Sequence, residues 1–255
     1  MRTWAFSCSV PGNERRPHVS KVNEEWKVGP HGPLERLDDG LLTVAGEIRM
    51  PLGNFPRRMT VVALGRNRTA IFSPVALGDD EMTAIEALGM PAYLIVPSAA
   101  HRLDLRPFHA RYPKAKIVTS PGGKRGVEEA AKPVQVKVDL GDRAKILVLA
   151  GCDEGEIALL VHGQDGATLI TNDVIGNVGH PQGIGARIMA RLMGFGPRPR
   201  VTRPAKWFFI KDKAALAAQF REWAGIDGLR RLIPSHGDIV DRPSELLRRL
   251  ADGLG

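Results

Sequence analysis

The apolar positions of this chain fall in short runs that stop abruptly at polar or small residues. The clearest run, 92–96, is broken by a proline, and His101 follows just beyond it. Three later runs end in the same way, at Cys152, Asp173 and His236. A buried strand that ends like this presents a polar group at the edge of a sheet. We therefore expect these four strand ends to meet.

The runs form two blocks of strands. The first block starts with three strands in quick succession, which indicates an antiparallel start, and then alternates strands with helices, which favours parallel strands. Its expected strands lie at 41–48, 59–64, 69–75, 93–96 and 115–120. The second block has strands beginning at Val134, Lys145, Glu156 and Ala167, and a final strand from Leu229. Two blocks of this kind predict a two-sheet architecture.

Stretches with helical spacing lie between and after the strands. Residues 79–89 have acidic residues at the front and a glycine at the end, as a capped helix does. Residues 184–196 form an amphipathic pattern with Arg187 and Arg191 one turn apart on the outer face. Further helices are expected after His101, at 211–224 and from Pro243 onward. With helices outside the sheets, the fold class is α/β (α+β).

The N-terminal segment differs from the rest of the chain. Residues 1–38 are rich in proline and have no sustained period, which indicates an extended arm that precedes a single domain at 39–255. Such an arm favours a homodimer in which it wraps the partner subunit. The first residues lack the long apolar stretch of a signal peptide, and no run approaches the roughly 18 apolar residues of a membrane helix. We expect a cytoplasmic protein with no membrane partner.

Cysteine content and charge narrow the classes of function further. The two cysteines, Cys8 and Cys152, stand in unrelated contexts, which excludes a disulfide framework. The net charge of +8 raises the alternative of nucleic-acid binding through basic residues between Arg198 and Lys213. No recognised nucleic-acid module accompanies the charge, so a solvated basic surface is the preferred interpretation.

The order of elements, the polar strand ends and the closing I-P-S-H-G turn resemble the metallo-β-lactamase fold from about Leu41 to Gly237. Within that superfamily the chain is similar to uncharacterised bacterial members with a degenerate metal-binding motif. The segments that carry this likeness are P-L-G-N-F-P-R-R-M-T-V-V-A-L, here within Met50–Leu64, and S-P-V-A-L, here Ser73–Leu77. The resemblance implies a four-layer αββα sandwich of two mixed β-sheets with a metal site along one edge of the sheets.

Members of this superfamily carry His-x-His-x-Asp-His after a strand, a histidine in a Gly-His-Thr turn, a bridging aspartate and a last histidine before a glycine. The resemblance assigns metal-ligand roles to His101, Asp173 and His236. Cys152 stands where the Gly-His-Thr histidine would be, and Glu156 lies close behind it. The other positions of the first motif hold residues that are not effective metal ligands, namely Val96, Ser98 and Ala100.

The retained residues suit one divalent metal ion better than two. Neutral imidazole nitrogen and carboxylate oxygen are good ligands for zinc, with iron or manganese as alternatives, and three protein ligands leave a position for a water nucleophile. If the Cys152 thiolate joined them, the site would instead be a closed structural zinc site. Each residue also has a purely structural interpretation, in which His101 bonds a loop, Asp173 caps a turn and Cys152 packs in the core.

These observations leave two principal hypotheses. The first is a mononuclear metal-dependent hydrolase of a small ester, thioester, lactone or phosphoester. The second is a non-catalytic binding or scaffold protein on the same fold. Asp104 and His180 are weaker site candidates, for which a surface role is preferred, and neither Ser98 nor Ser235 has the base and orienting group of a nucleophilic serine.

Overall fold

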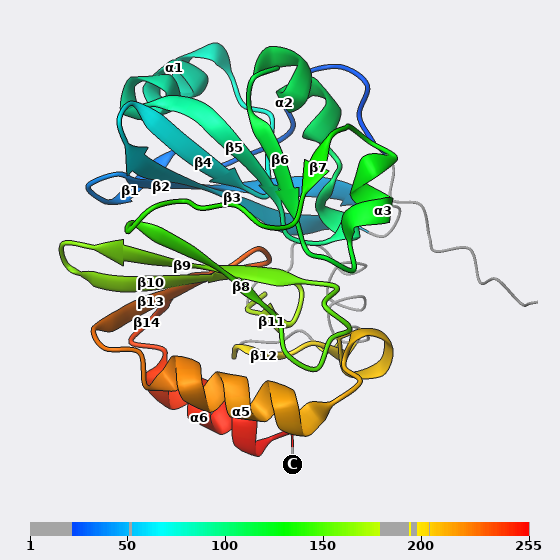
Figure 1. Ribbon diagram of the computed structural model, residues 1–255, viewed down its shortest axis with the longest axis vertical. Coiled ribbons are helices and arrows are strands. Elements are labelled where there is room, and N and C mark those ends of the chain that lie inside the picture. Colours follow the sequence, from blue (N-terminus) through cyan, green and yellow to red (C-terminus); the bar gives the residue numbers. More distant parts are fainter. Residues whose placement is uncertain (1–21, 51–52, 179–193, 195–197, 204, 255) are drawn as a thin grey trace, which may run out of the picture.

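The computed structural model describes residues 22–50, 53–178, 194, 198–203 and 205–254. Two β-sheets face each other, and helices cover the outer face of each, so that the chain forms four layers (Figure 1). The predicted αββα sandwich of two mixed sheets is confirmed. Within the described residues, no helix is long and apolar enough to cross a membrane.

The first sheet has the strand order β1-β2-β3-β4-β5-β6-β7. Its strands are β1 (Glu35–Asp38), β2 (Leu41–Met50), β3 (Gly53–Gly65), β4 (Arg68–Phe72), β5 (Met90–Val96), β6 (Lys116–Thr119) and β7 (Val134–Gln135). The first four pair antiparallel, and β4 through β7 pair parallel. The outer helices of this half are α1 (Asp79–Leu88), α2 (Leu105–Arg111) and the short α3 (Lys124–Glu128), with a 3-10 turn, η1 (Ala99–His101), after β5.

The second sheet has the order β14-β13-β10-β9-β8. Its strands are β8 (Ala144–Val148), β9 (Ile157–Gly163), β10 (Gly166–Thr171), β13 (Leu229–Pro234) and β14 (Val240–Asp241). A separate two-stranded ladder joins β11 (Ile175–Gly176) to β12 (Arg200–Val201). The outer helices are α5 (Lys213–Ala224) and α6 (Ser244–Asp252), and a π-helical turn, η2 (Ala205–Phe209), precedes α5.

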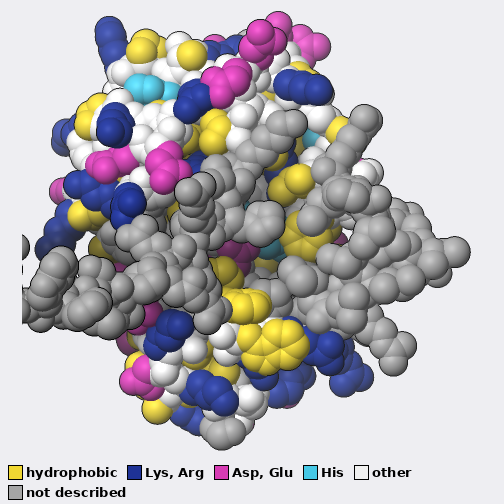
Figure 2. Space-filling view, turned by 90° about the vertical axis from the view of Figure 1, so that its right-hand side faces the viewer, with side chains coloured by type: hydrophobic (Ala, Val, Ile, Leu, Met, Phe, Trp, Pro, Cys, Tyr) yellow, Lys and Arg dark blue, Asp and Glu magenta, His cyan; other side chains and the backbone are white. Residues whose placement is uncertain are grey.

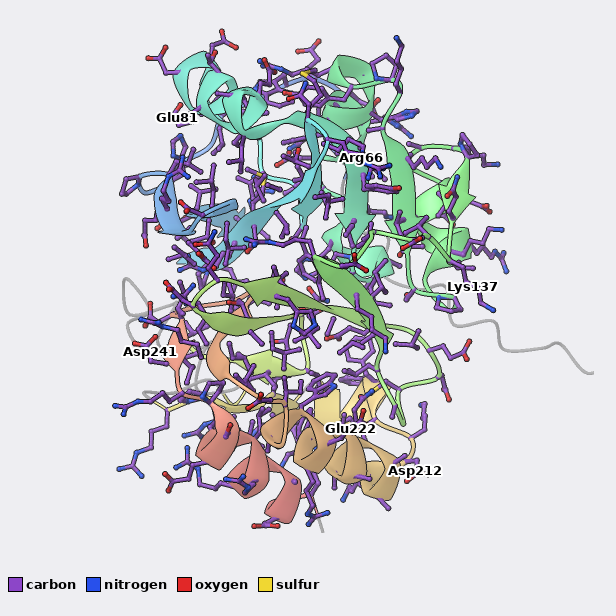
Figure 3. All side chains as sticks on the ribbon, turned by 60° about the vertical axis from the view of Figure 1, so that its left-hand side comes forward. Arg66, Glu81, Lys137, Asp212, Glu222 and Asp241 are labelled. Atoms are coloured by element: carbon purple, nitrogen blue, oxygen red, sulfur yellow. The ribbon has the colours of Figure 1, made fainter. Side chains whose placement is uncertain are left out.

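Strand alternation explains how one sheet serves two apolar layers. Along β3, Met59 and Val61 pack under the helices of the first half, whereas Val62 and Leu64 pack between the sheets. Successive side chains of a strand point to opposite faces, so a strand that is buried on both faces reads as one continuous apolar run. Charged side chains such as Asp212 and Asp241 lie on the outside of the sandwich (Figure 3).

Three segments differ from or extend the sequence-based expectation. Strands β2 and β3 pair from Leu41 opposite Val62 to Met50 opposite Gly53, beyond the ends of the predicted strands. The alternating run from Val134 was expected in the second block, but it adds the two-residue strand Val134–Gln135 to the first sheet, parallel to β6. The helix expected at 184–196 lies outside the described residues.

The described part of the predicted arm, residues 22–38, packs against its own first sheet. The Trp26 ring lies 4.7 Å from the ring of Phe108, and its indole nitrogen donates to the carbonyl of Leu77. The amide of Gly32 donates to the carbonyl of Ala45, and residues 35–38 add strand β1 to the sheet edge. A homodimer through the arm stays a prediction.

Asp104 ties this segment to the first half from a fully buried position. Its carboxylate accepts hydrogen bonds from the Asn23 side chain at 2.6 Å and from the Ala76 amide at 3.1 Å. It also pairs with the Arg57 guanidinium at 2.7 Å. The expected surface role of Asp104 is therefore wrong, because three distant segments supply partners that no local pattern of the sequence reveals.

We predict that Asp104→Ala lowers the free energy of unfolding by about 3–5 kcal/mol, because it leaves the buried Arg57 cation without its partner. Urea denaturation measures this change. Asp252→Ala is the matched control, since Asp252 pairs with Arg221 on the surface and its removal should cost less than about 1 kcal/mol. Similar losses for the two variants would contradict the structural role of Asp104.

Candidate metal centre

Three strand ends from both sheets deliver polar side chains to one point. His101 ends η1, directly after β5 of the first sheet, whereas Asp173 and His236 each follow a strand of the second sheet by two residues. Those strands, β10 and β13, are parallel neighbours whose pairing extends to Thr171 opposite Pro234. The chains therefore leave the sheet at the same level and in the same direction, which places Asp173 beside His236.

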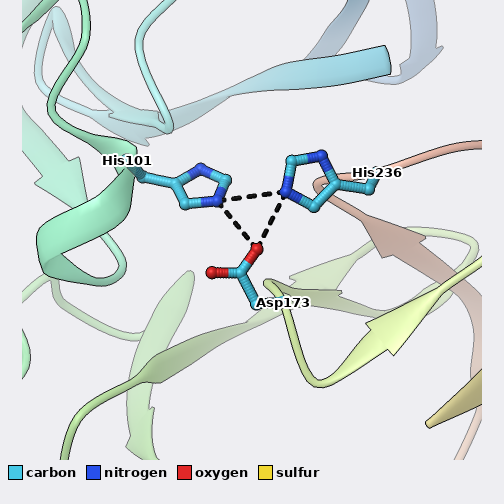
Figure 4. Close-up of side chains that lie close together, drawn as sticks. All are labelled: His101, Asp173 and His236. Atoms are coloured by element: carbon cyan, nitrogen blue, oxygen red, sulfur yellow. Dashed lines mark hydrogen bonds and ion pairs between the residues drawn. The ribbon is translucent and has the colours of Figure 1, made fainter. Parts of the chain in front are cut away.

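The ligand atoms of the three residues form a compact triangle (Figure 4). One carboxylate oxygen of Asp173, Oδ1, lies 3.1 Å from Nε2 of His101 and 2.8 Å from Nε2 of His236. The two Nε2 atoms are 3.2 Å apart. Three of the four predicted ligands therefore converge.

The far side of each imidazole is held by a hydrogen bond. Nδ1 of His236 lies 2.7 Å from the carbonyl oxygen of Pro56 and must carry the proton that it donates there. Nδ1 of His101 lies 2.9 Å from the Ser73 hydroxyl. Partners at Nδ1 fix the ring orientation and direct Nε2 into the site, as in histidine ligands of metal proteins.

Ser73 and Asn172 were not predicted as part of the site. Ser73 has a φ of 56°, a left-handed conformation that is uncommon for a residue other than glycine and costly unless its surroundings enforce it. The Asn172 amide lies 3.1 Å from Oδ2 of Asp173. The sequence held one indication for each residue. Ser73 begins the S-P-V-A-L segment that carries the family resemblance, and Asn172 directly precedes the predicted ligand Asp173.

The environment of Asp173 keeps its carboxyl ionised. Burial alone would raise the pKa of this group, but the imidazoles of His101 and His236 outweigh burial and hold the pKa below its usual range. The Ser98 hydroxyl lies 3.5 Å from Oδ2, and the Thr202 hydroxyl donates to the backbone carbonyl of Asp173. An ionised, oriented carboxylate is the form that binds a metal ion.

The glycine after His236 has a steric reason. Gly237 has a φ of 105°, and a Cβ at this position would lie 1.9 Å from the carbonyl oxygen of Asn177. Its own carbonyl oxygen accepts two hydrogen bonds from Arg58, whose pKa is lowered by burial between the sheets. The S-H-G turn is thus fixed from both sides, which places His236 firmly.

Cys152 does not join the three converging residues. Its side chain is buried in the apolar layer between the second sheet and α5, and burial, followed by the charges of Glu156 and Asp153, raises the pKa of its thiol to about 12. The preceding Gly151 must be glycine because a Cβ there would lie 2.0 Å from the carbonyl oxygen of Asp212. The turn containing Cys152 is therefore packed against the start of α5.

Glu156 is a buried acidic residue that interacts with the loop carrying Asp173. Its carboxylate accepts a hydrogen bond from the amide of Val174, next to Asp173. Burial raises its pKa well above the usual value, and the charge of Asp173 raises it further. A carboxyl group with a raised pKa stays neutral over a wider pH range. Its hydrogen bond to the Val174 amide holds the loop that carries Asp173.

The positions without ligating residues fill their space with apolar or weakly polar groups. Val96 is fully buried in the core under the helices. Ala100 lines a pocket of about 190 Å³ beside the three ligands, together with apolar residues such as Ile48 and Phe55 and the guanidinium-bearing Arg57. His180 lies outside the described residues.

The donor set fits a zinc ion with three protein ligands. Tetrahedral ligands at about 2.0–2.1 Å from zinc are about 3.3 Å apart. The three separations in the triangle, 2.8, 3.1 and 3.2 Å, are close to this edge length. Two neutral nitrogens and one carboxylate are suitable ligands for zinc, and also for iron.

Comparison with solved structures shows that the chain has the metallo-β-lactamase fold. VMB-1 matches with a TM-score of 0.61 at 12% identity, over 91% of this chain and 98% of that one. The metallo-β-lactamase FIM-1 of Pseudomonas aeruginosa, in its mono-zinc form, gives 0.57 at 14% identity, over 89% and 97%. A metallo-β-lactamase of Hirschia baltica gives 0.56 at 16% identity, over 88% and 98%.

No model of a known protein family and no curated protein matches the sequence. Identities at this level define the fold and leave the chemistry to the residues of the site. The narrower resemblance to uncharacterised bacterial members stays a prediction.

We predict that the Cys152 thiol of the folded protein reacts very slowly with alkylating reagents at pH 8. With a thiol pKa of about 12, roughly one molecule in ten thousand carries the reactive thiolate, and burial limits access further. A Cys8→Ser variant isolates the signal of Cys152, and mass spectrometry after iodoacetamide treatment measures it. Denatured protein should react fully, whereas rapid labelling of the native form would contradict the buried position.

Proposed function

We propose that this protein is a mononuclear metal-dependent hydrolase, with His101, Asp173 and His236 as the metal ligands. The observation that carries the proposal is the convergence of two Nε2 atoms on one carboxylate oxygen, with both Nδ1 atoms already bonded elsewhere. A site in which only one nitrogen of each ring faces the centre is preorganised for an ion. We infer zinc first, with iron or manganese as alternatives.

The residues of the chain divide the work of such a site. His101 and His236 offer neutral nitrogen, and the ionised Asp173 supplies one negative charge that a dication requires. Ser73 and the Pro56 carbonyl hold the two rings in place. A bound zinc ion supplies Lewis acidity, which polarises a carbonyl or phosphoryl oxygen and lowers the pKa of water.

The pocket limits the size of the substrate. Its volume of about 190 Å³ is below the roughly 300–1,000 Å³ of typical ligand pockets. Apolar residues such as Phe55 and Leu103 line it beside the ligands. These properties support a small ester, thioester, lactone or phosphoester as the substrate.

The apolar replacements in the first motif support the second candidate, a binding or scaffold protein without turnover. Val96 and Ser98 stand in place of the two imidazoles of one metal position of the fold pattern, and Ala100 stands in place of the aspartate of the other. Val96 belongs to the core. The two candidates differ in whether a substrate is consumed.

We predict about one zinc ion per chain in protein purified without chelator, measured by elemental analysis. His101→Ala and His236→Ala should each lower the affinity at least about tenfold, because each removes one of three ligands. His162→Ala is the matched control, since this histidine is exposed on β9 away from the triangle. Cys152→Ala should also keep the metal content of the parent protein.

Absence of zinc, iron and manganese at stoichiometric level would contradict the metal centre and leave the binding protein as the function.

Substrate turnover is measured separately, with chromogenic acetate, thioester, lactone and phosphodiester panels. Activity should be abolished by Asp173→Asn and by chelation and restored in the chelated parent protein by added zinc. A loaded protein with no activity on any panel would support the binding role.

A further inference from the structure

A second feature of the surface lies outside the metal centre. Three consecutive aromatic residues of η2 protrude into solvent, with Trp207 69% exposed, Phe208 65% and Phe209 49%. Among the described residues, the other exposed large apolar side chains, Val28, Met90 and Val148, lie apart from one another in the sequence. Exposed apolar patches of this kind mark interaction sites.

The fold pushes these rings outward by fixing the two ends of the turn. Ala205 and Ile210, which flank the aromatic residues, are both buried in the apolar layer of the second half. The amide of Ile210 donates to the carbonyl of Ala205, and the amide of Lys211 donates to the carbonyl of Gly151. Ala205 and Ile210 make the contacts with the apolar layer, so the three aromatic side chains do not contribute to that layer.

Exposed basic side chains flank the aromatic turn in the sequence. Between 198 and 213 the sequence contains the basic residues Arg198, Arg200, Arg203, Lys206, Lys211 and Lys213. The single acidic residue of this stretch, Asp212, accepts a hydrogen bond from the Ala215 amide as the N-cap of α5. Figure 2 shows the face that carries η2, with hydrophobic side chains among Lys and Arg side chains in its lower half.

We propose that this surface docks on an anionic lipid bilayer, with the rings of Trp207 and Phe208 in the interface and the lysines against the headgroups. Aromatic rings favour the boundary between headgroups and acyl chains, and each nearby cation is attracted to an anionic leaflet. The net charge of +8 reinforces this attraction. Such a contact needs no spanning helix, because the surface lies in the interface and not across the bilayer.

The shape of the turn favours a bilayer over a polynucleotide. Bases of single strands stack on aromatic side chains that line a groove. Trp207 and Phe208 instead leave about two thirds of their surface exposed to solvent. Rings with this exposure can insert into a bilayer interface, whereas a single nucleic-acid strand is bound in a groove.

The test uses the full chain in a flotation assay with vesicles. Vesicles of mixed phosphatidylcholine and phosphatidylserine should bind the protein at low salt, and vesicles of phosphatidylcholine alone should bind it at least tenfold more weakly. Trp207→Ala/Phe208→Ala should lower the partition at least tenfold, and Lys206→Glu/Lys211→Glu should do the same and weaken the salt dependence. Circular dichroism and thermal unfolding verify that each variant is folded.

Two matched controls test the location of the surface. Val28→Ala/Met90→Ala removes exposed apolar side chains elsewhere, and Lys114→Glu/Lys116→Glu makes the same charge change on exposed lysines of the first half. Both should bind vesicles as the parent protein does. Equal loss in the controls would overturn the proposal.

Other occupants of the patch give distinct results. If light scattering shows a dimer that Trp207→Ala/Phe208→Ala converts to monomer, with no vesicle binding by the parent, the patch joins two copies and the proposal is wrong. Binding of a labelled oligonucleotide without binding of vesicles would overturn it as well. The proposal does not depend on the metal centre, because neither vesicle binding nor its loss in these variants requires an ion.

Discussion

The parallel pairing of β10 with β13 is the constraint on which the candidate metal centre depends. The ladder continues past the strands, since the Ser235 amide donates to the carbonyl of Thr171 and the Asn177 amide donates to the carbonyl of His236. Asp173 and His236 are therefore enclosed between two rungs of backbone hydrogen bonds. His101 reaches them from the opposite sheet, and its end of β5 is joined to the second sheet by the bond from the Ile157 amide to the Pro97 carbonyl.

Electrostatics explains why these three residues occur together. A carboxylate that is largely removed from water is costly unless charged or polar partners compensate, and each imidazole likewise needs partners at both nitrogens. Asp173 meets the two Nε2 atoms, while Ser73 and Pro56 meet the two Nδ1 atoms. These contacts make the half of the site with His101, Asp173 and His236 polar, whereas the half in which the superfamily pattern has two further imidazoles holds Val96, which is buried in the core, and Ser98.

The sequence predicted the strand ends better than the surroundings of the site. Apolar runs that stop at a polar residue identified His101, Asp173 and His236, because the end of a buried strand can be recognised from the local hydrophobic pattern. Cys152 has the same pattern but points into the core, since a thiol is also a small apolar group and its direction depends on the packing of Gly151 against α5. The burial of Asp104 depends on Arg57, which is distant in sequence, so no local pattern shows it.

The segment from Thr202 to Ile210 links the metal centre to the surface in a short length of chain. Thr202 holds the carbonyl of Asp173, and its hydroxyl also accepts a hydrogen bond from the Ala205 amide at the start of η2. Five residues after Thr202 the chain exposes Trp207 to solvent, although Ala205 and Ile210 already supply the apolar contacts. Packing among the described residues therefore explains the ends of this turn but not the three aromatic side chains between them.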